Sequence, residues 1–319
     1  MFSCYKLVTE NTASGRGTIL NYHRVFESGA TLRPDALLKD EFASKMLFLK
    51  QHFNVMSLPD LLAAAENDEL PPLAVAITVD DGYKDGHSII APILSDLNLS
   101  GAFFITTEGI EEGLLWNDKI ANAIYRTQEK EIKGFLNIAP QSISSFEEKR
   151  TVHQRIHNMC KFMSLDKRIA TINSLVELLN VDISEEVFLL PNEIVEMHNA
   201  GMIIGAHTHR HPVLALESES VAREEISRSK YVLEDILKTS IDYFAYPNGK
   251  YLEDFNAHHK SILVELGFKA SLSTDWGCID SATDMMAIPR YTPWDHSTAK
   301  WGLRLCHHFR KMRKIRSKA

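Results

Sequence analysis

The sequence has few cysteines and no long apolar run. Its four cysteines stand far apart, at Cys4, Cys160, Cys278 and Cys306, so their spacing indicates neither a zinc ribbon nor a disulfide framework. No stretch is apolar enough to span a bilayer, which takes about 20 residues. Residues 1–17 also lack the apolar core of a secretory signal peptide. We therefore expect the protein to reside in the cytoplasm.

Internal repeats and low-complexity segments are also absent, and the composition is that of an ordinary soluble protein. Of the 319 residues, 45% are hydrophobic and 24% are charged, as in globular domains generally. The length suits one large α/β domain or two smaller ones. The net charge is −7, and we expect no nucleic-acid partner.

This net charge conceals a basic C-terminal end. Residues 304–319 contain seven Lys or Arg and no acid, whereas residues 1–303 carry 28 basic and 42 acidic side chains. Apolar residues recur there at helical spacing: Trp301, Leu305, Phe309, Met312 and Ile315. Such a helix can lie on the anionic inner face of a membrane. Alternatively, it packs its apolar stripe on the protein and ends in a basic tail, which is the favoured interpretation for Trp301 and Leu305.

The first chemical signal is a pair of carboxylates at the end of an apolar run. Leu73–Val79 is rich in β-branched residues and follows Pro71-Pro72, which predicts a buried strand. Asp80, Asp81 and Gly82 come directly after it. A metal ion relieves the repulsion between such acids and separates their roles, one as a ligand and the other as a base. A solvated Asp-Asp-Gly turn is the alternative.

A second signal follows a later strand, where three histidines fall within five residues. His207 and His211 are four residues apart, so a tight loop or helical turn can aim both at one ion. Two neutral imidazoles and one carboxylate make a three-ligand site with open positions for water and substrate. The alternative is a structural cluster or a surface run, particularly for His209. Each motif alone is incomplete as a metal site, so the two support each other.

A third signal is the sequence from Phe244 to Gly249, FAYPNG. Proline and glycine make a rigid turn at a strand end, and backbone N–H groups in such a turn can bind a developing oxyanion. An ordinary turn is the alternative interpretation.

Strands and helices alternate along most of the chain, which indicates a parallel sheet. We predict strands over residues 17–22, 54–57, 73–79, 99–106, 202–206, 241–246, 268–274 and 286–292. Helices are predicted over 40–52, from 58, and over 87–97, 191–200, 218–237 and 251–266. Between about 108 and 193 the alternation lapses, which predicts a mostly helical insertion. In a βα-barrel, catalytic residues lie at the C-terminal ends of strands, and the unusual residues fall there.

Taken in order, the motifs TVDDG (Thr78–Gly82), HTHRH (His207–His211) and FAYPNG (Phe244–Gly249) resemble the polysaccharide deacetylase family, with its NodB-type domain (carbohydrate esterase family 4). The resemblance covers about residues 17–295, less the insertion. It is strongest to the branch with the poly-N-acetylglucosamine deacetylases, which also shows a strand ending in Tyr-His-Arg, here Tyr22–Arg24, and a late Pro-Arg, here Pro289-Arg290.

This resemblance implies a distorted (β/α)7 barrel within residues 1–303 and one divalent metal ion, most often Zn²⁺. It assigns Asp81, His207 and His211 as metal ligands and Asp80 as the general base. The backbone N–H of Asn248 then binds the oxyanion. A protonated histidine donates a proton to the leaving amine.

The chain departs from the common family pattern at two of these roles. Many members carry an arginine where this chain has Ala245, and the branch resemblance implies that Arg290 replaces it. The late Leu-x-His motif that supplies the acid is missing, which leaves His23 as the candidate acid and His296 as its rival. Trp276 either walls the acetyl pocket or is a packed aromatic.

The sequence therefore predicts a metal-dependent deacetylase that hydrolyses the N-acetyl group of an acetamido sugar in a glycan or glycan precursor. One alternative is a carbohydrate O-acetyl esterase, because the same site cleaves esters. A carbohydrate-binding protein with a degenerate site is the other. An acetylated carbohydrate is the expected ligand in all three cases.

Overall fold

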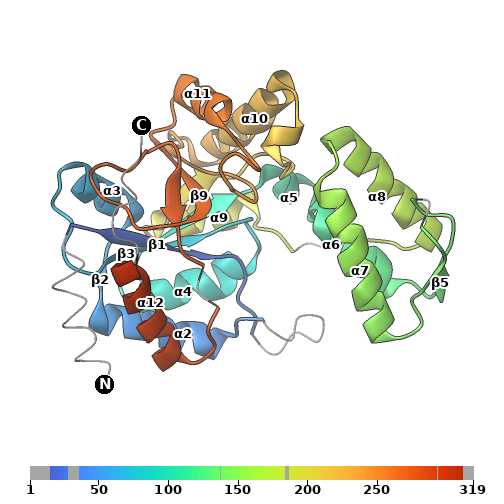
Figure 1. Cartoon of the computed structure of the whole chain (residues 1–319), viewed down its shortest axis with the longest axis horizontal. Helices are drawn as coiled ribbons and strands as arrows, with labels where there is room; N and C mark the ends of the chain where they lie inside the picture. The colour runs from blue at the N-terminus through green and yellow to red at the C-terminus, as the bar shows by residue number, and fades with distance from the viewer. Residues whose placement is uncertain (1–14, 28–35, 137, 184–186, 293, 312–319) are drawn as a thin grey trace.

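The computed structural model describes residues 15–27, 36–136, 138–183, 187–292 and 294–311. It is a parallel β-barrel surrounded by helices, with a helical insertion to one side (Figure 1). Seven parallel strands follow one another around the barrel. In spatial order they are β1 (Gly17–Tyr22), β3 (Ala74–Val79), β4 (Gly101–Ile105), β7 (Ile203–Ala206), β8 (Tyr243–Ala245), β9 (Ala270–Trp276) and β10 (Ile288–Arg290). The short β2 (Asn54–Val55) pairs with the start of β3.

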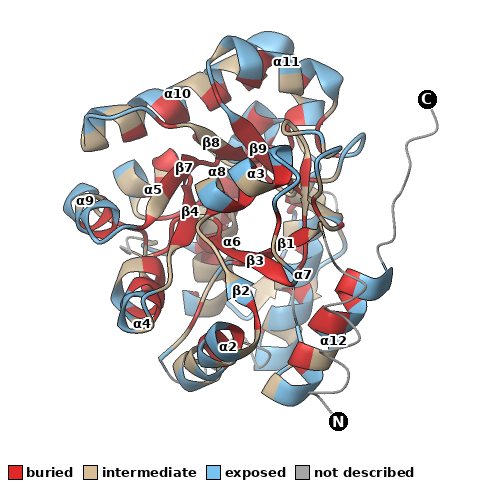
Figure 2. Ribbon diagram, turned by 90° about the vertical axis from the view of Figure 1, so that its left-hand side faces the viewer, coloured by how far each residue is buried: buried red, intermediate tan, exposed pale blue. Residues whose placement is uncertain are grey.

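The barrel is nearly closed by hydrogen bonds between its first and last strands. Asn21 N–H donates to Tyr291 O at 3.0 Å, and Tyr291 N–H donates to Ile19 O at 2.8 Å. The fold is therefore the distorted (β/α)7 barrel that the motifs predict. Its strands are mostly buried and its helices surround them (Figure 2), which explains why β3 and β4 are almost continuously apolar.

Successive residues of β3 serve two different apolar clusters. Val75 and Ile77 belong to the large cluster shared with the surrounding helices. Ala74 and Ala76 belong to a smaller cluster that includes Phe104 of β4. This alternation follows from the two-residue period of a strand. Asp80 directly follows β3 and therefore lies at the end of the barrel.

Helices connect the strands on the outside of the barrel (Figure 2). They are α2 (Lys39–His52), α3 (Leu58–Glu66), α4 (Ala91–Asp96) after a π-helical turn (Gly86–Ile90), α5 (Thr107–Glu112), α9 (Pro191–Asn199), α10 (Glu219–Leu237) and α11 (Ala257–Glu265). A 3-10 turn spans Leu214–Leu216. The predicted helix over 251–266 was wrong at its start, because the side chain of Asn256 accepts from His258 N–H and caps the helix there.

The insertion is mostly helical and has an apolar core of its own (Figure 1). It comprises α6 (Trp116–Arg126), β5 (Glu131–Ile132), β6 (Gln141–Ser142), α7 (Phe146–Lys161) and α8 (Leu165–Leu179). The two short strands form an antiparallel pair. Ser145 and Glu148 form a capping box at the start of α7.

The last described helix, α12 (Thr298–Lys311), lies beside α2. Its residues Trp301, Leu305 and Phe309 are at most 1% exposed, so this part of the apolar stripe packs on the protein, as the favoured interpretation of Trp301 and Leu305 has it. The expected start of the tail at residue 304 falls within this helix. Met312 and Ile315 lie outside the described residues. Among the described residues, no helix is both long and apolar enough to cross a membrane.

Candidate active site

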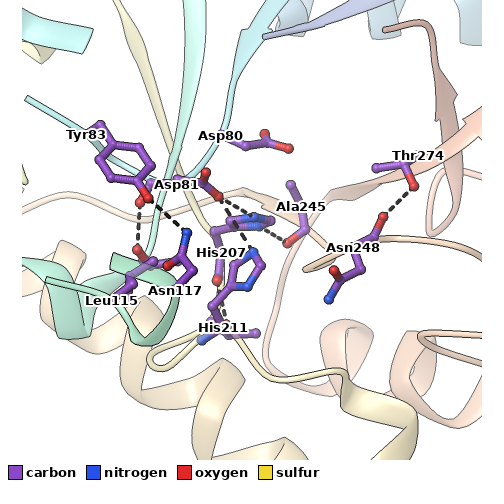
Figure 3. A network of polar contacts seen from close by, with 12 residues as sticks. Asp80, Asp81, Tyr83, Leu115, Asn117, His207, His211, Ala245, Asn248 and Thr274 are labelled. Atoms are coloured by element: carbon purple, nitrogen blue, oxygen red, sulfur yellow. Dashed lines mark hydrogen bonds and ion pairs between the residues drawn. The ribbon is translucent and has the colours of Figure 1, made fainter. Parts of the chain in front are cut away.

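A tight turn after β3 separates the two carboxylates. Asp81 and Gly82 have φ angles of 80° and 92°, in the left-handed region where glycine is favoured. A Cβ atom on Gly82 would also lie 2.7 Å from a side-chain carbon of Ile105, so this position requires glycine. The turn points Asp81 toward His207 and His211, whereas among the described residues no hydrogen bond or ion pair joins Asp80 to either ring (Figure 3).

The loop after β7 brings two imidazoles together. His207 Nδ1 donates to the Ala245 carbonyl at 2.7 Å, which leaves its Nε2 lone pair free. Thr208 and His211 have φ angles of 64° and 54°. His211 N–H donates to Thr208 Oγ1 at 3.1 Å and tightens the loop, so that the two rings lie 4.9 Å apart.

Asp81, His207 and His211 have the geometry of a metal site. Each histidine Nε2 is 3.6 Å from Asp81 Oδ1, and the three ligand atoms lie within 4.8 Å of one another. A distance of 3.6 Å is too long for a hydrogen bond. Ligand atoms about 2.1 Å from a tetrahedral zinc ion would lie about 3.4 Å apart. The donors therefore fit a divalent ion, and two imidazoles with one carboxylate suit zinc.

Burial and neighbouring charges shift the pKa values of the three ligand residues in different directions. Burial, together with nearby His207, lowers the pKa of His211 to about 3, so this imidazole is neutral at pH 7 and able to bind a metal. Burial also acts to lower the pKa of His207, but Asp81 and Asp80 outweigh it and hold the pKa above its usual value. Burial alone would raise the pKa of Asp81, but the surrounding histidines reverse the effect and keep this carboxylate ionised.

Asp80 is held by a fully buried arginine. Arg290 Nη1 and Nη2 donate to the two Asp80 oxygens at 2.8 and 2.7 Å, and the two residues are only 1% and 2% exposed. The guanidinium is itself fixed by Ser273 O, Asn21 Oδ1 and Thr78 Oγ1. Burial acts to raise the pKa of Asp80, but Arg290 and His207 bring it below its usual value. Asp80 is therefore an ionised carboxylate, the form that can accept a proton.

His23 lies beside these carboxylates because β1 and β3 pair in register. Tyr22 pairs with Val79, so the next residues, His23 and Asp80, leave the sheet side by side. His23 is exposed, and its charge lowers the pKa of both Asp80 and Asp81. The rival, His296, instead pairs with a carboxylate of α2 at 3.0 Å and is 58% exposed at its side chain. This arrangement favours His23 as the acid.

The turn after β8 brings Asn248 near Ala245 and the histidines (Figure 3). Asn248 has a φ angle of 60°, and its carbonyl accepts from Thr274 Oγ1. Gly249 O accepts from Thr274 N–H at 2.7 Å. Within the described part of the chain, the Asn248 N–H has no hydrogen-bond acceptor, so it can donate to an oxyanion.

Two other residues named from the sequence have different settings. His209 is not a surface residue: it is 4% exposed, and its ring is hydrogen-bonded to Thr107 Oγ1. It does not belong to the metal-ligand group. Trp276 is 46% exposed and stacks on Trp294, with ring centroids 5.2 Å apart, so it is an accessible aromatic surface.

The residues that support the two loops were not predicted from the sequence. Tyr83 donates to Asp118 of α6, and Arg168 of α8 donates to the backbone of the histidine loop. Tyr83 adjoins the TVDDG motif, and that position was an available signal. Nothing in the local sequence marks Arg168, because its partners are more than 40 residues away.

A parallel barrel with carboxylate, imidazole and guanidinium groups at the C-terminal ends of its strands is the architecture of an α/β-barrel enzyme. A family model, polysaccharide deacetylase, matches residues 67–270, which is more than half of the chain. The protein therefore belongs to the polysaccharide deacetylase family. No curated protein sequence matches it significantly.

Three solved structures illustrate the fold. The deacetylase PplD of Streptococcus pyogenes is 19% identical, with a TM-score of 0.59 over 87% of this chain and 92% of its own. IcaB of Ammonifex degensii is 19% identical, with a TM-score of 0.56 over 93% and 97%. A de-N-acetylase of Aggregatibacter actinomycetemcomitans is 18% identical, with a TM-score of 0.55 over 90% and 99%. At this identity the likeness establishes the fold.

Proposed function

We propose that the protein is a metal-dependent deacetylase that hydrolyses the N-acetyl group of an acetamido sugar in a glycan or glycan precursor. The observation that carries the proposal is the convergence of Asp81, His207 and His211 beside an Asp80 that Arg290 holds in place. Family membership supports the same chemistry.

The chain's own groups account for the proton transfers that amide hydrolysis needs. A divalent ion held by Asp81, His207 and His211 would supply a Lewis acid for the acetyl carbonyl and for water. Asp80, ionised and oriented by Arg290, accepts the proton of the attacking water. The Asn248 N–H donates to the oxyanion, and His23 protonates the nitrogen as the C–N bond breaks. The products are acetate and a free amine.

The test is acetate release from N-acetylglucosamine oligomers, measured together with zinc content by mass spectrometry. We expect zinc-dependent release that falls by about 10²-fold or more in Asp80→Asn, as for the loss of a positioned acid–base group. Asp96→Asn is the matched control, because Asp96 is exposed on α4. Release only from O-acetylated sugars would make the protein an esterase. Sugar binding without acetate release from either substrate would make it a binding protein.

A further inference from the structure

The helical insertion contacts the loop that carries Asp80 and Asp81. Tyr83 O–H donates to the Asp118 carboxylate of α6, at 3.1 and 3.0 Å from its two oxygens. Asn117 donates to the Tyr83 oxygen at 3.2 Å (Figure 3). Tyr83 is 3% exposed and Asp118 is 7% exposed, so these are interior contacts. The first helix of the insertion, α6, thus holds the loop that carries Asp80 and Asp81.

The chain returning from the insertion pairs with the same loop. Leu189 N–H donates to Gly82 O at 3.0 Å, and Lys84 N–H donates to Val187 O at 2.9 Å. Phe188 lies between these two bonds and packs on the Tyr83 ring, with centroids 4.5 Å apart. The turn that orients Asp81 is therefore bound on both flanks by segments that begin and end the insertion.

The histidine loop is held by a third part of the insertion. Arg168 of α8 donates from Nη2 to Arg210 O at 2.9 Å and from Nη1 to His211 O at 3.2 Å. Arg168 is 1% exposed, and its guanidinium lies 4.7 Å from the Trp116 ring of α6. One planar side chain thus spans two successive carbonyls at the residue that carries the second imidazole.

These loops need such support because their backbones are strained. Asp81, Thr208 and His211 all have positive φ angles, which non-glycine residues rarely adopt unless the surroundings hold them there. A metal site also gains affinity when its ligands are fixed in advance by outer hydrogen bonds.

We propose that the insertion is a clamp that preorganises the metal ligands, with Arg168 positioning His211 and Tyr83 positioning Asp81. This inference rests on the metal site of the proposed function. Neither Arg168 nor Tyr83 belongs to the group of metal ligands. They act through the backbone of the loops, so their loss should weaken metal binding itself rather than a chemical step.

The experiment measures the zinc dissociation constant of the full chain by competition with a chromogenic chelator. The variants are Arg168→Met, Arg168→Lys and Tyr83→Phe. The matched control is Ile156→Val, because Ile156 is fully buried in the insertion's own core. Thermal unfolding of each zinc-free variant reports general destabilisation separately.

We expect Arg168→Met to weaken zinc binding by about 10- to 100-fold, the range for partners that orient metal ligands. Arg168→Lys should recover little, since an ammonium group cannot span two carbonyls. Tyr83→Phe should weaken binding to a lesser degree, and Ile156→Val should lower the melting temperature with the zinc affinity unchanged. Wild-type zinc affinity in folded Arg168→Met would overturn the clamp, as would an equal loss in Ile156→Val. If the wild-type chain binds no zinc, the metal site itself fails and the clamp fails with it.

Discussion

Replacing Arg290 by methionine should expose the electrostatic cost of burying Asp80. Methionine keeps much of the side-chain volume but removes both hydrogen bonds to the carboxylate. Breaking a buried ion pair by removing one partner typically costs about 3–5 kcal/mol. Because Asp80 is only 2% exposed, we expect a loss in this range in the free energy of unfolding at pH 8, measured by urea titration with chelator present.

The sign of the pH dependence follows from the two pKa values of Asp80. In the wild type, its pKa lies below the ordinary 3.8. The carboxylate therefore stabilises the fold above that pH, and this contribution is lost as the pH falls through the folded pKa. In Arg290→Met, burial would raise the pKa of Asp80 in the folded state above 3.8. The free energy of unfolding of this variant therefore declines as the pH rises from 3.8 to that raised pKa. The loss relative to wild type should therefore shrink at acid pH, by at most about 1.4 kcal/mol per pH unit.

A double-mutant cycle measures the interaction energy between Asp80 and Arg290. Asp80→Asn removes the charge that Arg290→Met leaves unpaired, so the double variant should be more stable than the two separate losses predict. If the losses simply add, and the effect of Arg290→Met is the same at pH 5 and pH 8, then the reasoning about an unpaired buried carboxylate is wrong. In that case Arg290 would act only by filling space.

Three further predictions concern the site and the tail. His23→Ala should impair amide cleavage more than ester cleavage, since an amine leaves less readily, and His296→Ala should not; the reverse result would exchange their roles. His207→Ala should lose zinc, measured by mass spectrometry, and wild-type zinc affinity should fall as the pH decreases because the pKa of His207 lies above its usual value. A chain ending at Lys300 lacks most of α12 and should be less stable, whereas a chain ending at Lys311 keeps that helix. If these two chains and the full chain sediment equally with anionic vesicles, the basic tail has no membrane role.

The sequence indicated the residues that converge in the structure more readily than the residues that support them. Asp80, Asp81, His207 and His211 stand in short motifs directly after strands, so the parallel barrel alone explains why they meet. Arg168 stands in an ordinary amphipathic helix, and its contact with the histidine loop depends on how two distinct apolar cores pack together. Local pattern carries no information about that packing.

Periodicity also had limits where tertiary contacts override it. The stripe through Trp301 and Leu305 favoured a helix face that packs on the barrel, and both residues are buried in the large apolar cluster. The residues from Tyr251 to Phe255 looked helical, yet Phe255 instead stacks on Tyr246 with centroids 3.5 Å apart. That contact and the Asn256 cap keep the segment outside α11.

The position of Arg290 illustrates how a barrel can present a guanidinium to one carboxylate from different strands. Many family members carry the arginine on the strand where this chain has Ala245, whereas here it comes from β10. The ends of all seven strands meet at one rim, so a guanidinium can reach Asp80 from more than one of them. Ala245 keeps a part in the site through its backbone, because its carbonyl fixes the His207 tautomer. The geometry thus pairs a cation with Asp80 and a backbone acceptor with His207, and two different strands supply them.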